Sequence, residues 1–209
     1  MIPAPEALER LAEGNRRFVA GVRQHESLAS EAKRNALLAG QRPFAIILGC
    51  SDSRVPAELV FDQGLGDLFV IRVAGNIVAA SQVGSVEFAA EQFGTRLVVV
   101  LGHTQCSAVT TTLEELMRET ASRSRNLQSI VDRVRPAVES LLFADPPLDP
   151  HALLHQAVRA NIRASAHQLR HGSEVLEQLI VTRGLVVVGA EYSLETGAVE
   201  FFDGMPGNA

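Results

Sequence analysis

The two cysteines of this 209-residue chain are the residues best placed to do chemistry. Cys50 lies in the segment GCSDSR, and Cys106 lies in GHTQC, three residues after His103. Two thiolates and a neutral imidazole form the ligand set of a zinc site that keeps its fourth position free, and the thiolate charges cancel that of Zn²⁺. Soft sulfur ligands argue against magnesium or calcium.

The residues alone leave other roles for the cysteines open. Buried cysteines often act as small hydrophobic side chains, and a catalytic or redox cysteine is a further alternative. Asp52 and Arg54 lie in the turn directly after Cys50, and they favour the zinc site over the other roles. Side chains two positions apart in an extended turn lie on the same side, so these two can meet. An aspartate beside a guanidinium can form a bidentate, charge-assisted pair. The alternative is a surface ion pair of negligible energy.

Short apolar runs precede both motifs and predict strands that are buried on both faces. These runs cover residues 44–49, 68–73, 97–101 and 185–189. Helical segments between them predict a parallel sheet with right-handed crossovers. Ligands of such sheets bind beyond the carboxyl ends of the strands. If the first and third strands are neighbours, we expect the side chains of Cys50, His103 and Cys106 to converge.

The remaining pattern is mostly helical. Helices are expected at residues 6–20, 31–39, 81–93, 127–143, 151–171 and 173–181, with another from the third strand to about residue 118. Ser81, Thr104 and Asp149 are the expected N-caps, and Pro136 should kink or end its helix. Residues 119–126 are expected to form a polar linker, and residues 198–202 a last hairpin strand.

Composition excludes several classes of protein. Hydrophobic residues make up 46% and charged residues 21%, which is typical of a globular domain. With 24 acidic against 19 basic residues, no nucleic-acid partner is expected. The apolar runs are too short to span a membrane. Two cysteines cannot form a disulfide framework, and the first residues do not resemble a signal peptide, so we expect a cytoplasmic protein.

Together, CSDSR at 50–54 and HTQC at 103–106 resemble the β-class carbonic anhydrases. The similarity continues through FDQGLGDLFVIRVAGN at 61–76 and VGSVEF at 83–88, and it covers nearly the whole chain. The resemblance implies an α/β fold with a mostly parallel four-stranded sheet, flanking helices, an added antiparallel C-terminal strand and an N-terminal helical arm that embraces a partner.

The resemblance also implies how the chain is organised. A single domain would span residues 1–209. Residues 1–40 would form the arm, residues 41–118 the zinc-site core, and residues 119–209 the C-terminal helices and last strands. Self-association as a homodimer or homotetramer is implied as well.

The implied activity is the reversible hydration of carbon dioxide to bicarbonate and a proton by a zinc-bound hydroxide. One zinc ion per chain would be held by Cys50, His103 and Cys106. Asp52 and Arg54 would be the catalytic pair. If Arg54 did not hold it, Asp52 could turn onto the metal as a fourth ligand and close the site.

Further substrate-binding residues are implied by the same resemblance. Gln41, nine residues before Cys50, marks the type of β-class enzyme with an accessible zinc and a glutamine that helps to bind substrate. The other type has a tryptophan in a bicarbonate regulatory pocket, at the position of Ile47 here, and this chain contains no tryptophan.

A narrow apolar pocket is expected for carbon dioxide, because the substrate offers little to hydrogen-bond. Val73 and Gly75 are expected in its lining, together with Ala74, Phe61 and Phe88, in part across two subunits. Core packing is the alternative for each of them.

One residue departs from the family pattern. Ser107 directly follows the second cysteine, where the family usually has glycine. Its added Cβ and hydroxyl could alter substrate access or the loop, or be neutral if the local φ is negative.

Two other functions remain compatible with these residues. One is a non-enzymatic, zinc-stabilised module whose fourth metal position is permanently filled. The other is a zinc hydrolase of a related small linear substrate such as carbonyl sulfide. The Asp52–Arg54 pair favours an enzyme over a module, because a structural site needs no such pair.

Overall fold

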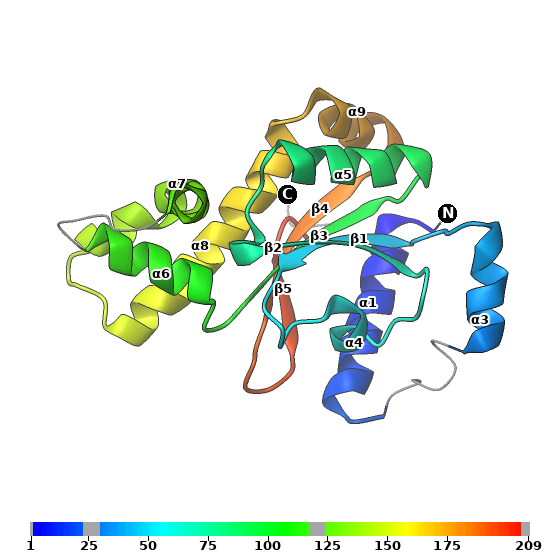
Figure 1. The fold of residues 1–209 in the computed structure, drawn as a ribbon, viewed down its shortest axis with the longest axis horizontal. Helices are drawn as coiled ribbons and strands as arrows, with labels where there is room; N and C mark the ends of the chain where they lie inside the picture. The colour runs from blue at the N-terminus through cyan, green and yellow to red at the C-terminus, as the bar shows by residue number, and fades with distance from the viewer. Residues whose placement is uncertain (1, 23–29, 118–123, 206–209) are drawn as a thin grey trace.

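The computed structural model describes residues 2–22, 30–117 and 124–205. It has one five-stranded sheet with helices on both faces (Figure 1). The first four strands run parallel in the order β2-β1-β3-β4, and β5 pairs antiparallel with β4. The predicted fold class is therefore confirmed. The strands are β1 (Ala45–Cys50), β2 (Leu68–Val73), β3 (Leu97–His103), β4 (Val186–Tyr192) and β5 (Val199–Asp203).

Helices connect the strands and cover the sheet. They are α1 (Ala4–Val19), α3 (Glu31–Ala36), α4 (Ala57–Val60), α5 (Ala80–Gln92), α6 (Ser107–Leu116), α7 (Arg125–Val138), α8 (Pro150–His171) and α9 (Glu174–Arg183). Short 3₁₀ turns add η1 (Leu37–Ala39), η2 (Ala74–Asn76) and η3 (Glu139–Phe143). None of the described helices has an apolar stretch that could cross a bilayer.

The apolar strand runs arise because both faces of the sheet are covered. Ile46 and Leu48 of β1 pack into one cluster with residues of α5, α8 and α9. Ile47 points the other way, into a second cluster with residues of α1 and α4. Since successive side chains of a strand alternate between faces, burial on both sides requires a continuous apolar run.

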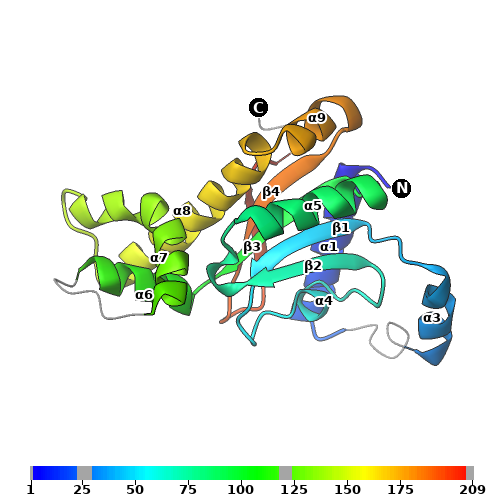
Figure 2. The same ribbon diagram turned by 45° about the horizontal axis from the view of Figure 1, so that its top comes forward.

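Helix α8 approaches β3 and β4 closely. A Cβ at Gly102 would lie 2.5 Å from the Ile162 side chain, and a Cβ at Gly189 would lie 2.9 Å from it. Glycine at both positions allows Ile162 to seat directly on the sheet. The N-terminal half of α8 also packs with α6 and α7, and these form a separate group beside the sheet (Figure 2).

Two predicted helix caps are wrong. Helix α5 begins at Ala80, with Ala79 as its N-cap, so Ser81 lies within the helix. Helix α6 begins only after Cys106. The Thr104 hydroxyl instead accepts a hydrogen bond from the Leu194 amide at 3.0 Å, and so ties the loop before α6 to the turn between β4 and β5.

The boundaries of α7 also differ from expectation. Ser124 caps this helix, so the end of the predicted 119–126 linker is helical, while residues 118–123 lie outside the described residues. Pro136 lies inside α7, which continues to Val138 and then tightens into η3. The predicted cap of α8 is confirmed, because the Asp149 carboxylate accepts hydrogen bonds from the amides of the next turn.

Candidate metal centre

The carboxyl ends of β1 and β3 lie side by side, and this places the three predicted ligands together. Cys50 is the last residue of β1, His103 is the last of β3, and Cys106 caps α6. Their ligand atoms all lie within 4.8 Å of one another, and all three residues are buried. In the described part of the chain, this is the one group of three or more such side chains that could hold a metal ion.

The geometry of the group fits zinc. The sulfur atoms of Cys50 and Cys106 lie 4.0 Å apart. Two thiolates on a tetrahedral zinc, each about 2.3 Å from the ion, lie about 3.8 Å apart. His103 Nδ1 lies 2.9 Å from the Thr104 carbonyl oxygen, an arrangement in which Nδ1–H donates and Nε2 carries the free lone pair. Nε2 is buried and has no hydrogen-bond partner among the described residues, as expected of an atom that binds a metal.

The protonation of the cysteines also favours a cation. A hydrogen bond from Cys106 lowers the pKa of the Cys50 thiol to about 4, against the effect of burial. The same bond and burial raise the pKa of Cys106. Burial lowers the pKa of His103, but the Cys50 thiolate and the Asp52 carboxylate outweigh it and raise the pKa overall. The group thus holds one thiolate, at Cys50, in an enclosed space beside a second thiol and an imidazole, and a bound cation would also favour the thiolate of Cys106.

Asp52 and Arg54 form the bidentate pair that their spacing suggests. Arg54 Nε donates to Asp52 Oδ1 at 2.9 Å, and Nη2 donates to Oδ2 at 2.7 Å. These bonds hold the pKa of Asp52 well below its usual range, so the group is a carboxylate at neutral pH. Asp52 Oδ2 lies 3.8 Å from His103 Nε2, which places the carboxylate beside the ligand group.

Arg72 fixes the turn that carries this pair, and sequence reasoning did not identify it as part of the site. From β2, its side chain donates to the carbonyl oxygen of Cys50 at 3.1 Å and to that of Asp52 at 2.6 Å. The available signal was an arginine inside an otherwise apolar strand. Its partners could not be inferred, because they depend on the register that places Arg72 beside Gly49.

Gly75 approaches the same centre from the end of β2. Its amide donates to Cys50 Sγ at 3.4 Å, and its φ of +73° falls in the left-handed region that favours glycine. The buried Asn161 of α8 donates to the Gly75 carbonyl oxygen at 2.7 Å and holds this turn in place. Val73 is paired with Cys50 in the sheet register.

A cavity of about 400 Å³ opens beside the ligands. Its lining comes from the turn after β1, the end of β2 and the start of α6. Ala74, which lies between the predicted substrate residues Val73 and Gly75, is part of it. The lining residues are Cys50, Ser51, Asp52, Ser53, Arg54, Ala74, Ser107 and Ala108.

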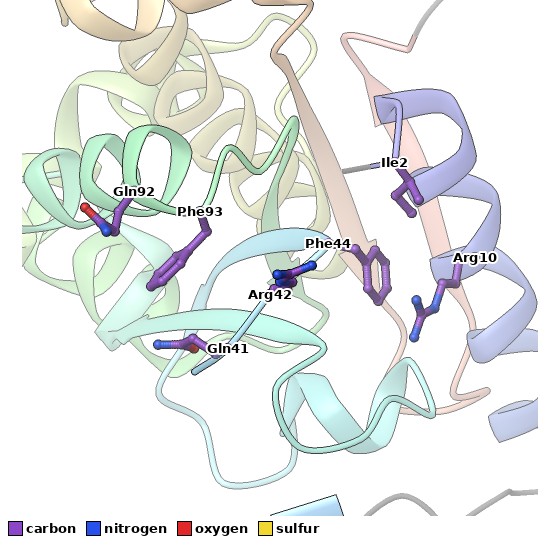
Figure 3. A pocket seen from close by; sticks show the side chains of 7 residues that line it. All are labelled: Ile2, Arg10, Gln41, Arg42, Phe44, Gln92 and Phe93. Carbon is purple, nitrogen blue, oxygen red and sulfur yellow. The ribbon is translucent and has the colours of Figure 1, made fainter. Parts of the chain in front are cut away.

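Gln41 lies at the other end of β1, four residues before its start. It lines a different cavity, of about 430 Å³, between α1 and the end of α5 (Figure 3). A strand rises about 3.3 Å per residue, so the five steps of β1 alone separate its ends by roughly 16 Å. Within one chain the structure therefore does not bring Gln41 to the ligand group. The cavity is lined by Ile2, Arg10, Gln41, Arg42, Phe44, Gln92 and Phe93.

The two phenylalanines considered for the substrate pocket also lie away from the ligand cavity. Phe61 is fully buried in the cluster beneath α1. Phe88, on α5, is 53% exposed and forms an aromatic group with Phe69 and Phe93. Since Phe93 also lines the cavity of Gln41, the three rings extend the surface on which Gln41 lies.

The chain resembles known proteins over most of its length. The carbonic anhydrase family model matches residues 45–199. The chain is 38% identical to "Carbonic anhydrase 2" of Mycobacterium tuberculosis over 191 residues, which cover 91% of this chain and 89% of the relative. Among solved structures it resembles the β-carbonic anhydrase CcaA, with a TM-score of 0.73, 27% identity and 94% and 95% of the two chains covered.

A tetrameric β-carbonic anhydrase of Sordaria macrospora also shares the fold. Its TM-score is 0.71 at 23% identity, and the match covers 93% of this chain and 96% of that one.

Proposed function

The chain belongs to the β class of the carbonic anhydrase family, and we propose that one zinc ion per chain, held by Cys50, His103 and Cys106, supports its activity. Enzymes of this family catalyse the reversible hydration of carbon dioxide to bicarbonate and a proton, and this is the function of the protein. The observation that carries the metal assignment is the buried convergence of two sulfurs and one unpartnered imidazole nitrogen.

Zinc, when bound, supplies a hydroxide near neutral pH and a positive charge beside the reacting carbon. The chain's own residues keep that charge accessible. Three protein ligands would leave a fourth position of a zinc ion free, and Cys50 lines the cavity through which substrate would reach it. The Thr104 carbonyl oxygen holds the His103 ring so that Nε2 faces the sulfurs.

Asp52 orients the nucleophile in this proposal. Its carboxylate stays ionised, lies beside the ligands and lines the cavity. A carboxylate oxygen there accepts a hydrogen bond from the attacking oxygen and turns a lone pair of that oxygen toward carbon dioxide. The role requires Asp52 to stay at a fixed distance from the ligands.

Arg54 provides that restraint. It engages both carboxylate oxygens, and its backbone amide adds a third hydrogen bond to Oδ1 at 2.9 Å. With these bonds in place, Asp52 would be held off a bound metal. Without them, Asp52 would be free to become the fourth ligand and close the site.

Val73 and Gly75 support the substrate end of the cavity. They flank Ala74, which lines it, and Gly75 is fixed by Asn161. The small side chains along this edge leave room for a linear molecule that needs few hydrogen bonds.

The direct test of the proposed function is stopped-flow hydration of carbon dioxide on metal-quantified protein, with Asp52→Asn expected to keep zinc and lose most turnover. Equal rates for the two proteins would remove the role of Asp52.

Self-association completes the site in this proposal. Gln41 cannot reach the ligands of its own chain, so a substrate-binding role requires it to act at the site of a second copy. The exposed Phe88 packs with the partly buried Phe69 and Phe93, and this aromatic group, which reaches the cavity of Gln41, offers an apolar surface for that contact. The tetrameric relative from Sordaria macrospora supports a homodimer or a dimer of dimers. The helix α1 would serve as the arm that contacts the partner.

Mixed oligomers test this arrangement. Gln41→Ala should weaken turnover and Cys106→Ser should abolish it, each as a homo-oligomer. When the two variants are refolded together, the Gln41→Ala chain supplies intact metal ligands and the Cys106→Ser chain supplies Gln41. A mixed site that combines the two should regain activity. No recovery in oligomers shown to contain both chains would mean that Gln41 does not act across subunits.

We also propose a cytoplasmic location. Cys50 and Cys106 are free, buried and close together, and metal binding requires both to remain reduced. Fractionation of the source cells with an antibody to the protein would test this.

A further inference from the structure

Ser107 lines the ligand cavity and has no part in the proposed mechanism. It is the first residue of α6, is exposed and lines the cavity together with Cys50, Asp52 and Arg54. Its φ is not positive, so the side chain causes no backbone strain there. Its hydroxyl has no hydrogen-bond partner in the part of the chain that the structure describes.

The position of this hydroxyl within the lining is distinctive. Five of the eight lining residues are Cys50, at the end of β1, and the four residues of the turn after it, which carries Asp52 and Arg54. The remaining three are Ala74, Ser107 and Ala108, and among these Ser107 alone has a polar side chain. Arg54 is already engaged with Asp52 through Nε and Nη2. Ser107 therefore offers an unengaged donor away from the Asp52–Arg54 turn.

The two forms of the substrate differ in what they can accept. Carbon dioxide is neutral and a weak acceptor, whereas bicarbonate carries a negative charge on oxygens that accept hydrogen bonds strongly. A donor hydroxyl in the cavity therefore distinguishes bicarbonate from carbon dioxide.

We propose that the Ser107 hydroxyl donates a hydrogen bond to an oxygen of bound bicarbonate, so that Ser107 sets the affinity of the site for bicarbonate and for similar small carboxylates. The proposal rests on the proposed metal centre and adds a residue that acts on its product.

A characteristic kinetic pattern follows. The overall equilibrium of the reaction is independent of the enzyme, so a variant cannot alter kcat/KM in one direction alone. A contact made with bound bicarbonate, but not with the transition state, lowers KM and kcat for dehydration together. Removing the hydroxyl should raise both and weaken product inhibition, with kcat/KM nearly unchanged.

The test compares four zinc-loaded proteins: the natural chain, Ser107→Ala, Ser107→Gly and Ser107→Thr. Calorimetric titration with formate, an unreactive carboxylate, measures binding without turnover, and dehydration kinetics give KM for bicarbonate. Ser107→Ala and Ser107→Gly should each weaken formate binding and raise KM about tenfold, the low end for a hydrogen bond to a charged group. Ser107→Thr, which keeps the hydroxyl, should resemble the natural chain.

Ser129→Ala is the matched control, because it removes an exposed helical serine hydroxyl on α7 whose partner is the Asn126 carbonyl oxygen. If Ser107→Ala binds formate as tightly as the natural chain, the proposal is overturned, and an effect confined to Ser107→Gly would overturn it equally. Failure of the metal centre itself would look different, since the natural chain would then lack zinc and activity.

Discussion

Two arginines hold carboxylates by paired hydrogen bonds, one at the metal centre and the other between α8 and the sheet. Arg54 holds Asp52, two residues away, and its side chain is 50% exposed. Arg159 of α8 holds Glu200 of β5 at 2.8 and 3.0 Å and also Glu191 of β4 at 3.2 Å.

The surroundings of the two pairs differ more than their geometry. Arg159 is only 17% exposed, lies 3.8 Å over the Phe202 ring and joins three elements that are distant in sequence. Arg54 and Asp52 lie in the same turn, so their pair connects no separate elements, and both residues line the ligand cavity. The same bidentate interaction therefore positions a reacting group in one place and holds helix to sheet in the other. Variants of the two arginines can separate these roles.

The largest effect is expected from Arg54→Ala. Loss of the restraint on Asp52 should lower kcat/KM about 100-fold, the usual result of misplacing a catalytic group. Zinc content and the free energy of unfolding should stay unchanged, because the exposed pair crosses no elements. Stopped-flow hydration, metal analysis and urea unfolding on one preparation would measure all three. Normal turnover in this variant would contradict the assigned role.

Arg159→Ala should show the opposite pattern. It leaves the buried Glu191 without its guanidinium and removes the contact with Phe202. The expected loss of unfolding free energy is about 2 kcal/mol, typical of leaving a buried polar group unpaired. Turnover per bound zinc should be unchanged. If this variant instead lost activity at full zinc occupancy, the contrast between the two pairs would be wrong.

Lysine at each position sharpens the contrast with smaller effects. Lysine keeps the charge but cannot make two parallel hydrogen bonds. Arg54→Lys should lower kcat/KM about tenfold, while Arg159→Lys should lower only stability, by about 1 kcal/mol. The same kinetic and urea measurements apply. A loss of stability in Arg54→Lys, or a loss of turnover in Arg159→Lys, would contradict the catalytic role assigned to Arg54 and the structural role assigned to Arg159.

The smallest effect concerns pH. The hydrogen bonds from Arg159 lower the pKa of Glu200 below its ordinary value. A depressed pKa means that the pair stabilises the fold above the pKa of unfolded glutamate, about 4.3, and that this stability is lost as pH falls through the lower folded value. Since the Glu200 side chain is 64% exposed, solvent screening limits the effect to a few tenths of a kcal/mol.

Urea unfolding of the natural chain and Glu200→Gln would measure this difference. The gap between the two proteins should be present at neutral pH and should shrink under acid conditions. A gap that widened as pH fell would reverse the sign of the linkage.

The sheet and the ligand group could be predicted because their signals are local. Continuous apolar runs mark strands buried on both faces, and the parallel order places Cys50 and His103 at one edge. The polar supports could not be predicted in the same way. Arg72 and Asn161 act on residues 20 and 86 positions away, and only the packed structure brings these together.

The wrong helix cap at Thr104 has a similar cause. Thr104 has the residue type of a helix cap, but a contact with Leu194 across the sheet takes its hydroxyl. The substrate-binding role of Gln41 was implied by the family resemblance and stays a prediction, and the length of an extended strand separates Gln41 from Cys50 within one chain. Local rules therefore indicated which residues do chemistry more reliably than which residues support them.

The most direct test of the metal centre is zinc analysis, together with carbon dioxide hydration, of the natural chain and of Cys106→Ser purified in parallel. We predict one zinc per chain and full activity in the first protein, and little zinc with activity near background in the second. Stoichiometric zinc and undiminished turnover in Cys106→Ser would contradict the account, as would a natural chain that is active without bound metal.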